Sequence, residues 1–410
     1  MQPTTATIIP SRRALEFGIY RDGDNNLDAS QSLTVAQALQ SSRTDSAVEF
    51  TVEDTTGLRV DDGDLVEGRK RTDSFTIADG QISDPQIGKA RNMASESNLA
   101  QFVAQTLERA EKSGAKQTWI DLVDHGGGDG GGLETHTGAV MSMPDMAQAI
   151  ADGVALHAKE HPEDAGRTVD GVVANQCLMD TMGFADALSR VGVKYLAASP
   201  ETMLSPGVPT GVADAIARNA GDPDAMARSV VNTAMRVRYP GPDGEWFGTA
   251  AAFDVLDLSP TKIANAERAI KTFNDAVAAD AADRPTIRRD VASVSGMVRF
   301  SGATPDMPWH ADRPAIALYD TIASDAALPS SLRSDARAAA NATRALVMAH
   351  QESRGFGPFD GSSYADAVGP TIHAPTARKQ IDPWASHGIS ETKNAFYDAV
   401  DQAKFVGAIA

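Results

Sequence analysis

The sequence predicts an α/β protein with a mostly parallel sheet flanked by helices, followed by a helical C-terminal region. Two observations lead to this fold class. Short apolar runs alternate with helical patterns through the first two-thirds of the 410-residue chain, which is typical of strands joined by crossover helices. Hydrophobic residues make up 42% of the chain, enough for a sizeable core. Sheets of this kind carry their functional groups at the carboxyl ends of the strands.

Strands are expected where short apolar runs are bounded by polar or turn residues. These runs cover residues 15–20, 47–52, 118–124, 169–174 and 194–199. Helices are expected between them, over 95–112, around 146–154 and over about 180–190, because apolar residues there recur at three- and four-residue steps. Each crossover between parallel strands is expected to be right-handed.

The pattern changes near residue 258, which divides the chain into a sheet domain over 10–257 and a mainly helical region over 258–410. Ser259 and Pro260 read as a helix cap and first helical position, and an apolar repeat from Ile263 follows. The remaining expectations for this region are helices over 313–325, over 333–350 and from about 391, a short strand near 367–373, and loops over 281–312 and 355–363.

The charge balance and the cysteine count exclude several classes of protein. The chain has 55 acidic and 37 basic residues, a formal charge of −18. Such a balance argues against a nucleic-acid partner, since phosphate backbones attract clustered Lys and Arg. The single cysteine rules out an internal disulfide and any metal site with several thiolates.

Targeting and membrane signals are not apparent in the sequence. The first ten residues lack a basic region followed by an apolar run, so they do not resemble a secretory signal peptide. No stretch approaches the roughly 18 apolar residues that span a bilayer. We therefore expect no membrane partner, and a location that is cytoplasmic or reached by export without a cleavable signal peptide. The oligomeric state is not predicted.

The first candidate site residue is His125, which follows a predicted buried strand and begins a glycine-rich run to Gly132. A flexible surface loop is the simplest interpretation of such a run. A phosphate-binding loop is disfavoured because the Gly-Lys-Ser/Thr ending is missing. However, a histidine at a strand end lies where open sheets place reactive groups, and the glycine N–H groups are free to approach a ligand.

The second candidate is Cys177, which follows the predicted strand at 169–174. A free cysteine is commonly a buried small hydrophobe, and that alternative stays open. Cys177 and His125 nevertheless follow neighbouring predicted strands, and an imidazole close to a thiol can act as its base. A cysteine, a histidine and a loop rich in N–H donors are the minimum parts of an acyl-transfer site.

Five short blocks in this order resemble the clostripain-like cysteine peptidases. The two signature blocks are Asp124–Gly128 and Cys177–Met179. The supporting blocks are Tyr20–Asp28 after the first strand, Ala198–Thr202 one strand after the cysteine, and Thr249–Asp254 at a later strand. The family belongs with the caspases, legumain, gingipains and separase, so the resemblance implies the caspase–haemoglobinase-like sheet.

The resemblance, which covers roughly residues 15–275, implies that 10–257 is a caspase-like catalytic domain. It implies a cysteine endopeptidase with Cys177 as nucleophile and His125 as base or general acid, and a protein or peptide as substrate. The N–H groups of Gly126 and Cys177 would form the oxyanion hole, and the reaction would pass through a thioester acyl-enzyme. No third catalytic residue is assigned. The alternative is a caspase-like scaffold or pseudoenzyme that binds peptides without cutting them.

The expected substrate-binding residues are Asn175, Ser199 and Glu201. Relatives that prefer Arg or Lys carry Asp at the position of Asn175, and an amide cannot form the charge-assisted pair that a carboxylate makes with guanidinium. Glu201 is the candidate to restore that charge; otherwise the preference should shift to an uncharged side chain. Asn175 as an ordinary strand-end cap is the structural alternative.

No metal ligands are assigned and no cofactor is expected to be required, although calcium is an option because some relatives depend on it. The segment from Asp22 begins like a calcium loop, but Leu27 and Leu33 occupy positions that need Gly and Glu. His125, Asp129, Glu134 and His136 match no common ligand spacing. The other histidines of the chain are either unplaced, namely His373 and His387, or expected at the surface, namely His157, His161, His310 and His350.

Overall fold

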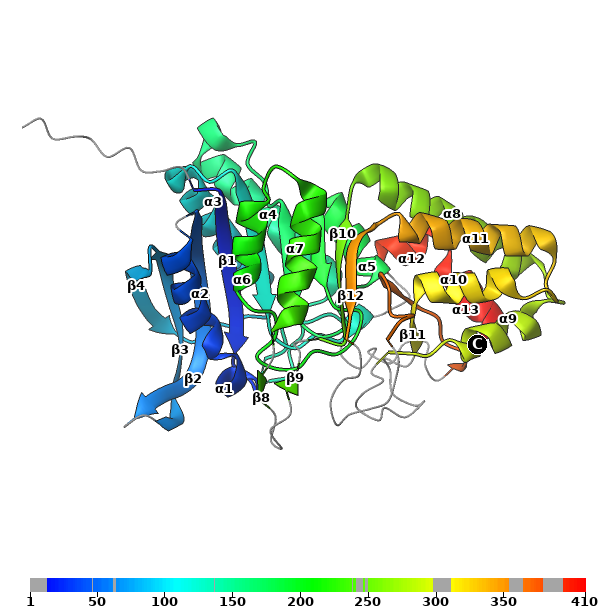
Figure 1. The fold of residues 1–410 in the computed structure, drawn as a ribbon, viewed down its shortest axis with the longest axis horizontal. Coiled ribbons are helices and arrows are strands. Elements are labelled where there is room, and N and C mark those ends of the chain that lie inside the picture. Colours follow the sequence, from blue (N-terminus) through cyan, green and yellow to red (C-terminus); the bar gives the residue numbers. More distant parts are fainter. Residues whose placement is uncertain are drawn as a thin grey trace, which may run out of the picture.

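A computed structural model describes residues 13–45, 47–61, 64–135, 137–237, 239–240, 246–247, 250–297, 311–353, 364–378 and 394–410, with backbone only for 57–61, 64–69, 239–240 and 246–247. Its main feature is a nine-stranded sheet in the order β12-β10-β7-β6-β5-β1-β2-β3-β4 (Figure 1). The strands from β7 to β2 are parallel, and those at both edges are antiparallel. The strands of the sheet are β1 (Leu15–Gly23), β2 (Val48–Asp61), β3 (Asp64–Ala78), β4 (Gln81–Lys89), β5 (Gln117–Val123), β6 (Gly171–Asn175), β7 (Tyr195–Ala198), β10 (Ala252–Asp257) and β12 (Val347–Glu352).

Helices cover both faces of the sheet because its central strands are apolar on both sides. One face packs against α2 (Leu33–Thr44), α6 (Gly211–Arg218) and α7 (Pro223–Arg236). The other face packs against α3 (Glu96–Ser113), α4 (Met143–Glu160) and α5 (Met182–Arg190). Short elements connect these layers: α1 (Asp28–Gln31), the 3₁₀ turns η1 (Gly128–Gly130) and η2 (Pro162–Asp164), and the strand pair β8 (Tyr239–Pro240) and β9 (Trp246–Phe247).

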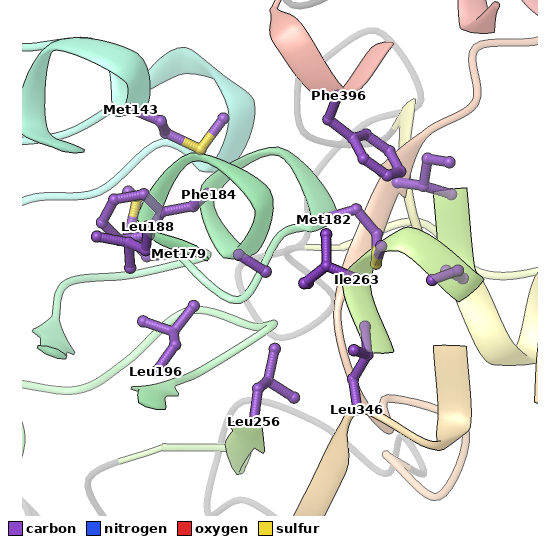
Figure 2. Packing of buried hydrophobic residues seen from close by; sticks show 14 of the residues in the cluster. Met143, Met179, Met182, Phe184, Leu188, Leu196, Leu256, Ile263, Leu346 and Phe396 are labelled. Atoms are coloured by element: carbon purple, nitrogen blue, oxygen red, sulfur yellow. The ribbon is translucent and has the colours of Figure 1, made fainter. Parts of the chain in front are cut away.

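The C-terminal helices lie beside the β12–β10 edge, at the opposite end of the sheet from β4 (Figure 1). One hydrophobic cluster runs from the α3–α5 face into these helices. Figure 2 shows Met182 of α5 and Ile263 of the C-terminal region among the side chains of that cluster. The elements of this region are α8 (Pro260–Ala279), α9 (Arg284–Ser293), β11 (Asp312–Pro314), α10 (Ala315–Ser324), α11 (Ser330–Arg344), β13 (Thr371–His373), α12 (Ala395–Ala399) and α13 (Gln402–Ile409).

The predicted sheet is confirmed, two local predictions are wrong, and two strands were missed. The helix predicted over 333–350 ends at Arg344, and β12 then pairs antiparallel with β10, because an open sheet edge overrides the alanine-rich helical pattern. The loop predicted over 281–312 contains α9. The antiparallel strands β3 and β4 were not predicted, since β4 is exposed along its length and lacks apolar alternation. The loop predicted over 355–363 lies outside the described residues.

The predicted boundary at residue 257 remains a prediction, but the described residues on its two sides share one core. β12 comes from the C-terminal region and completes the edge of the sheet. None of the helices in the described ranges is long and apolar enough to cross a bilayer.

Candidate active site

His125 and Cys177 come together at the carboxyl edge of the parallel sheet. Val123 at the end of β5 pairs with Asn175 at the end of β6, so residues two positions further along each chain emerge at the same edge. Both side chains are half-buried and line one cavity of about 130 Å³. That cavity is lined by Leu27, Gln31, Asp124, His125, Asn175, Gln176, Cys177, Met203, Leu204, Ser205 and Gly207.

The imidazole of His125 is held by the segment that follows β1. Its Nε2 atom lies 2.7 Å from Asn26 Oδ1. Because an amide oxygen only accepts hydrogen bonds, Nε2 carries the hydrogen and Nδ1 holds the lone pair. The neighbouring Asn25 donates to Asp124 Oδ1 at 2.5 Å, so the same segment fixes two consecutive residues. Burial lowers the pKa of His125 below its usual 6.5 and keeps the imidazole neutral at pH 7.

Asn26 is a site residue that was not predicted from the sequence. The signal lies in the sheet order: β1 is the neighbour of β5 in the sheet, with Arg21 opposite Val123. The segment after β1 therefore passes beside the segment after β5. Adjacency of β1 and β5, which are separated in sequence by three strands, cannot be inferred from local residue patterns.

The surroundings of Cys177 favour the protonated thiol at neutral pH. Burial raises the pKa of Cys177 to about 11, and the nearby Glu201 carboxylate contributes in the same direction. The Met203 N–H points to Sγ at 3.2 Å. Leu178, the next residue, has φ of +65°, a left-handed conformation that costs a non-glycine residue about 1–2 kcal/mol. The chain thus turns sharply right after the sulfur, with Leu178 N–H donating to Glu201 O.

The glycine-rich run is an ordered loop that approaches the cysteine segment closely. A Cβ on Gly126 would lie 2.2 Å from Cys177 O, so only glycine fits there. Gly131 has φ of +88°, which also favours glycine. Gln176 Nε2 donates to His125 O at 3.1 Å and ties the two site segments together. A flexible surface loop, the simplest interpretation of the sequence, is therefore wrong for this run.

The C-terminal region anchors the same loop. Tyr397 on α12 donates a short hydrogen bond to Asp129 Oδ2, and His373 Nδ1 lies 2.9 Å from Asp312 Oδ1. Burial and the neighbouring Asp312 carboxylate raise the pKa of Asp129 to about 7. Asp129 therefore lies with Asp312 and His373 rather than with His125, and the C-terminal region helps to fix the loop that begins at the histidine.

Asn175 lies at the cavity wall, but its amide is occupied by the backbone. Nδ2 donates to Val208 O at 3.1 Å, and Oδ1 accepts from Val208 N–H at 2.7 Å. The residue is only 2% exposed. Both ends of the amide thus clamp the segment containing Gly207, where a Cβ would lie 2.1 Å from Asn175 Oδ1. This geometry supports the strand-end structural role of Asn175.

Ser199 and Glu201 are fully buried. Neither is among the described residues that line the cavity. Ser199 Oγ donates to Glu201 O at 2.8 Å. Glu201 Oε1 accepts from the N–H and hydroxyl of Thr202 at 3.0 and 3.1 Å. Both side chains thus make local bonds behind the cavity wall, and their predicted role in substrate binding remains a prediction.

Two groups of three described side chains place candidate metal-ligand atoms within 4.8 Å of one another: Glu111, His157 and His161, and Asp129, Asp312 and His373. Calcium takes six to eight oxygen ligands, so neither histidine-containing group suits it. The expectation that His157 lies at the surface is wrong, because it is 1% exposed. His136, His310 and His387 lie outside the described residues.

Neither family models nor curated protein sequences give a match to the chain. Solved structures do match its fold. An inactive zymogen of a C11 protease from Parabacteroides distasonis covers 96% of this chain and 99% of its own, with a TM-score of 0.62 and 15% identity. A secreted C11 cysteine protease from Bacteroides thetaiotaomicron, solved with an irreversible peptide inhibitor, covers 95% and 99%, with a TM-score of 0.62 and 13% identity.

These similarities extend over nearly the whole chain, including the C-terminal region. The protein therefore has the fold of the C11, or clostripain-family, cysteine proteases. This confirms the predicted caspase–haemoglobinase-like fold. At 13–15% identity the comparison establishes the fold and not the chemistry, which depends on the residues of the site.

Proposed function

We propose that the protein is a cysteine endopeptidase in which Cys177 attacks the peptide carbonyl and His125 acts as base. The observation that carries this proposal is the common cavity of the two side chains, at the ends of neighbouring parallel strands. The two C11 protease structures that match nearly the whole chain support the same reaction. A peptide inhibitor bound to one of them is consistent with a peptide substrate here.

The protonation states indicate how the reaction would begin. With a thiol pKa of about 11 and a lowered imidazole pKa, the resting pair is neutral rather than thiolate–imidazolium. His125 Nδ1 would take the Sγ proton as sulfur bonds to the carbonyl carbon, and would pass it to the leaving amine as the C–N bond breaks. Water then hydrolyses the thioester. N–H groups of Gly126 and Cys177 are the proposed oxyanion donors.

The cavity favours an uncharged substrate side chain. Glu201 is bonded to Thr202 behind the wall, and Asn175 is bonded to Val208. The carboxylate that does line the cavity is that of Asp124, which is 2% exposed. Burial and the neighbouring Asp22 raise its pKa, which weakens its ability to pair with a substrate cation.

The pH dependence tests the proposal. The lowered pKa of His125 means that the neutral base is present at every pH above that value and is lost as the pH falls through it. We expect kcat/KM on uncharged peptides to reach its plateau by about pH 7.5, to keep it to pH 9 and to fall with a midpoint below 6.5. An acid limb centred well above 6.5 would contradict the neutral pair. Binding of peptides without turnover at any pH would favour the scaffold alternative.

Asn26 is a positioning residue in this proposal, because it holds His125 at 2.7 Å without lining the cavity. We expect Asn26→Ala to lower kcat/KM by about 10- to 100-fold, since a misoriented base costs rates of this order. Asn26 is exposed, so the thermal unfolding midpoint should not change. Asn26→Asp keeps an acceptor and adds a negative charge; it should restore activity and move the acid limb to higher pH. Unchanged profiles in both variants would exclude the role.

A further inference from the structure

Three potential metal ligands meet at the amino edge of the sheet, opposite to His125 and Cys177. His157 and His161 are four residues apart at the end of α4, and Glu111 lies near the end of α3. The two helices pack closely, since a Cβ on Gly153 would lie 2.6 Å from Ala100 O. This close parallel packing brings one candidate ligand atom from each of the three side chains within 4.8 Å of the others.

His157 has a buried ring nitrogen with no partner. Its side chain is fully buried, and Nε2 lies 3.3 Å from Asp164 Oδ2. A carboxylate only accepts, so Nε2 carries a hydrogen, and in the neutral ring Nδ1 bears the lone pair. Nδ1 is buried and makes no hydrogen bond to any described residue. Asp164 is itself held by Arg167. An imidazole oriented by a carboxylate on one nitrogen and open on the other is the arrangement of metal-binding histidines.

The other two side chains leave the group open to solvent. His161 Nδ1 lies 2.8 Å from Glu111 Oε2, and these side chains are 24% and 25% exposed. The rings of His157 and His161 are stacked, with centroids 4.9 Å apart. Glu163, which is exposed, places Oε1 3.9 Å from His161 Nδ1. An ion can therefore enter from the surface while His157 binds it from the buried side.

We propose that Glu111, His157 and His161 bind a divalent transition-metal ion, with Zn²⁺ as the preferred ion. Two imidazoles and one carboxylate suit zinc and not the harder calcium or magnesium. Ligand atoms about 2.0 Å from a tetrahedral zinc lie about 3.3 Å apart, so the group needs only small side-chain movements to close. The ion would link α3 to the end of α4, independently of the peptidase site at the other edge.

Zinc titration of the full chain tests this assignment in a Cys177→Ala background, which removes the thiol as a competing ligand. Competition with a zinc-binding dye should report one site per chain, and Zn²⁺ should raise the thermal unfolding midpoint while Mg²⁺ and Ca²⁺ do not. His161→Ala and Glu111→Gln, at half-buried positions, should each weaken zinc affinity at least tenfold. Lys159→Ala, an exposed position on the same helix, should leave it unchanged.

Two results would overturn the proposal. Equal zinc affinity in the parent, His161→Ala and Glu111→Gln proteins would place the ion elsewhere in the chain. A parent protein that binds zinc no more tightly than about 1 mM, the affinity of a fortuitous surface contact, would exclude a site. His161 lies at the opposite edge of the sheet from the cavity. His161→Ala in a chain that keeps Cys177 should therefore cleave peptides at the wild-type rate.

Discussion

Replacing the cysteine, Cys177→Ala, is expected to abolish peptide cleavage, with kcat/KM falling by at least about 10³-fold. Loss of Sγ removes the atom that forms the thioester, and no other thiol exists because the chain has one cysteine. The neutral imidazole of His125 would remain in place, held by Asn26 at 2.7 Å. Residual turnover would then report only base-assisted attack by water, which the surrounding N–H groups can support weakly.

Two controls accompany this substitution: the thermal unfolding of the variant and its binding of labelled peptides. Cys177 is half-buried and its Sγ lies 3.2 Å from Met203 N, so removal of Sγ should lower stability by less than about 1.5 kcal/mol. Thermal unfolding should therefore be close to wild type, and labelled peptides should still bind. A Cys177→Ala protein that cleaves as fast as wild type would exclude Cys177 as the nucleophile. A wild-type protein that binds but never cleaves would instead establish the scaffold alternative.

The two principal site residues could be found from sequence because their positions follow from local patterns. Buried parallel strands are recognisable as short apolar runs, and their carboxyl ends share one edge of the sheet. In the structure His125 and Cys177 each lie two residues past the end of such a strand, and both line one cavity. The helix over 95–112 was also predictable, since Leu99 and its apolar neighbours form one buried face.

The rest of the site depends on contacts between segments distant in sequence. Asn26 reaches His125 because β1 and β5 are adjacent in the sheet. Asn175 was expected as a pocket residue from the family resemblance, and it does line the cavity, but a returning segment at Val208 takes both ends of its amide. His157 reads as a surface residue in a polar stretch, yet its side chain is fully buried. Residue type and spacing do not encode which segment returns to a given place.

The difference between local patterns and contacts distant in sequence also explains the errors in the predicted fold. An alanine-rich run such as 333–350 has high helix propensity throughout, but its last residues complete the hydrogen bonds of β10. Pairing at an edge satisfies backbone groups that would otherwise face water or another chain. Local propensity therefore predicted the start of α11 and not its end. The strand β4 could not be predicted for a different reason: it is exposed along its length, so it has no buried face to produce an alternating pattern.

Adding one methyl group at the base of the site, Gly126→Ala, is expected to lower kcat/KM by at least about 100-fold, since displacements near 1 Å at a reacting group cost this much. The new Cβ would lie 2.2 Å from Cys177 O and 2.9 Å from both Gln176 Cβ and Met179 Cγ. The histidine and cysteine segments would have to separate. The backbone N–H of residue 126 is kept in alanine, so the loss would measure displacement and not the deletion of an oxyanion donor.

Gly166→Ala is the matched control, because a Cβ at Gly166 meets nothing within 4 Å. It should retain wild-type kcat/KM and stability, whereas Gly126→Ala should also lose about 1–3 kcal/mol of unfolding free energy from overpacking. Activity measured well below the unfolding midpoint separates misplacement from loss of folded protein. If Gly126→Ala cleaved within twofold of wild type, the close approach of the two segments would not be needed for catalysis. The glycine would then serve packing alone.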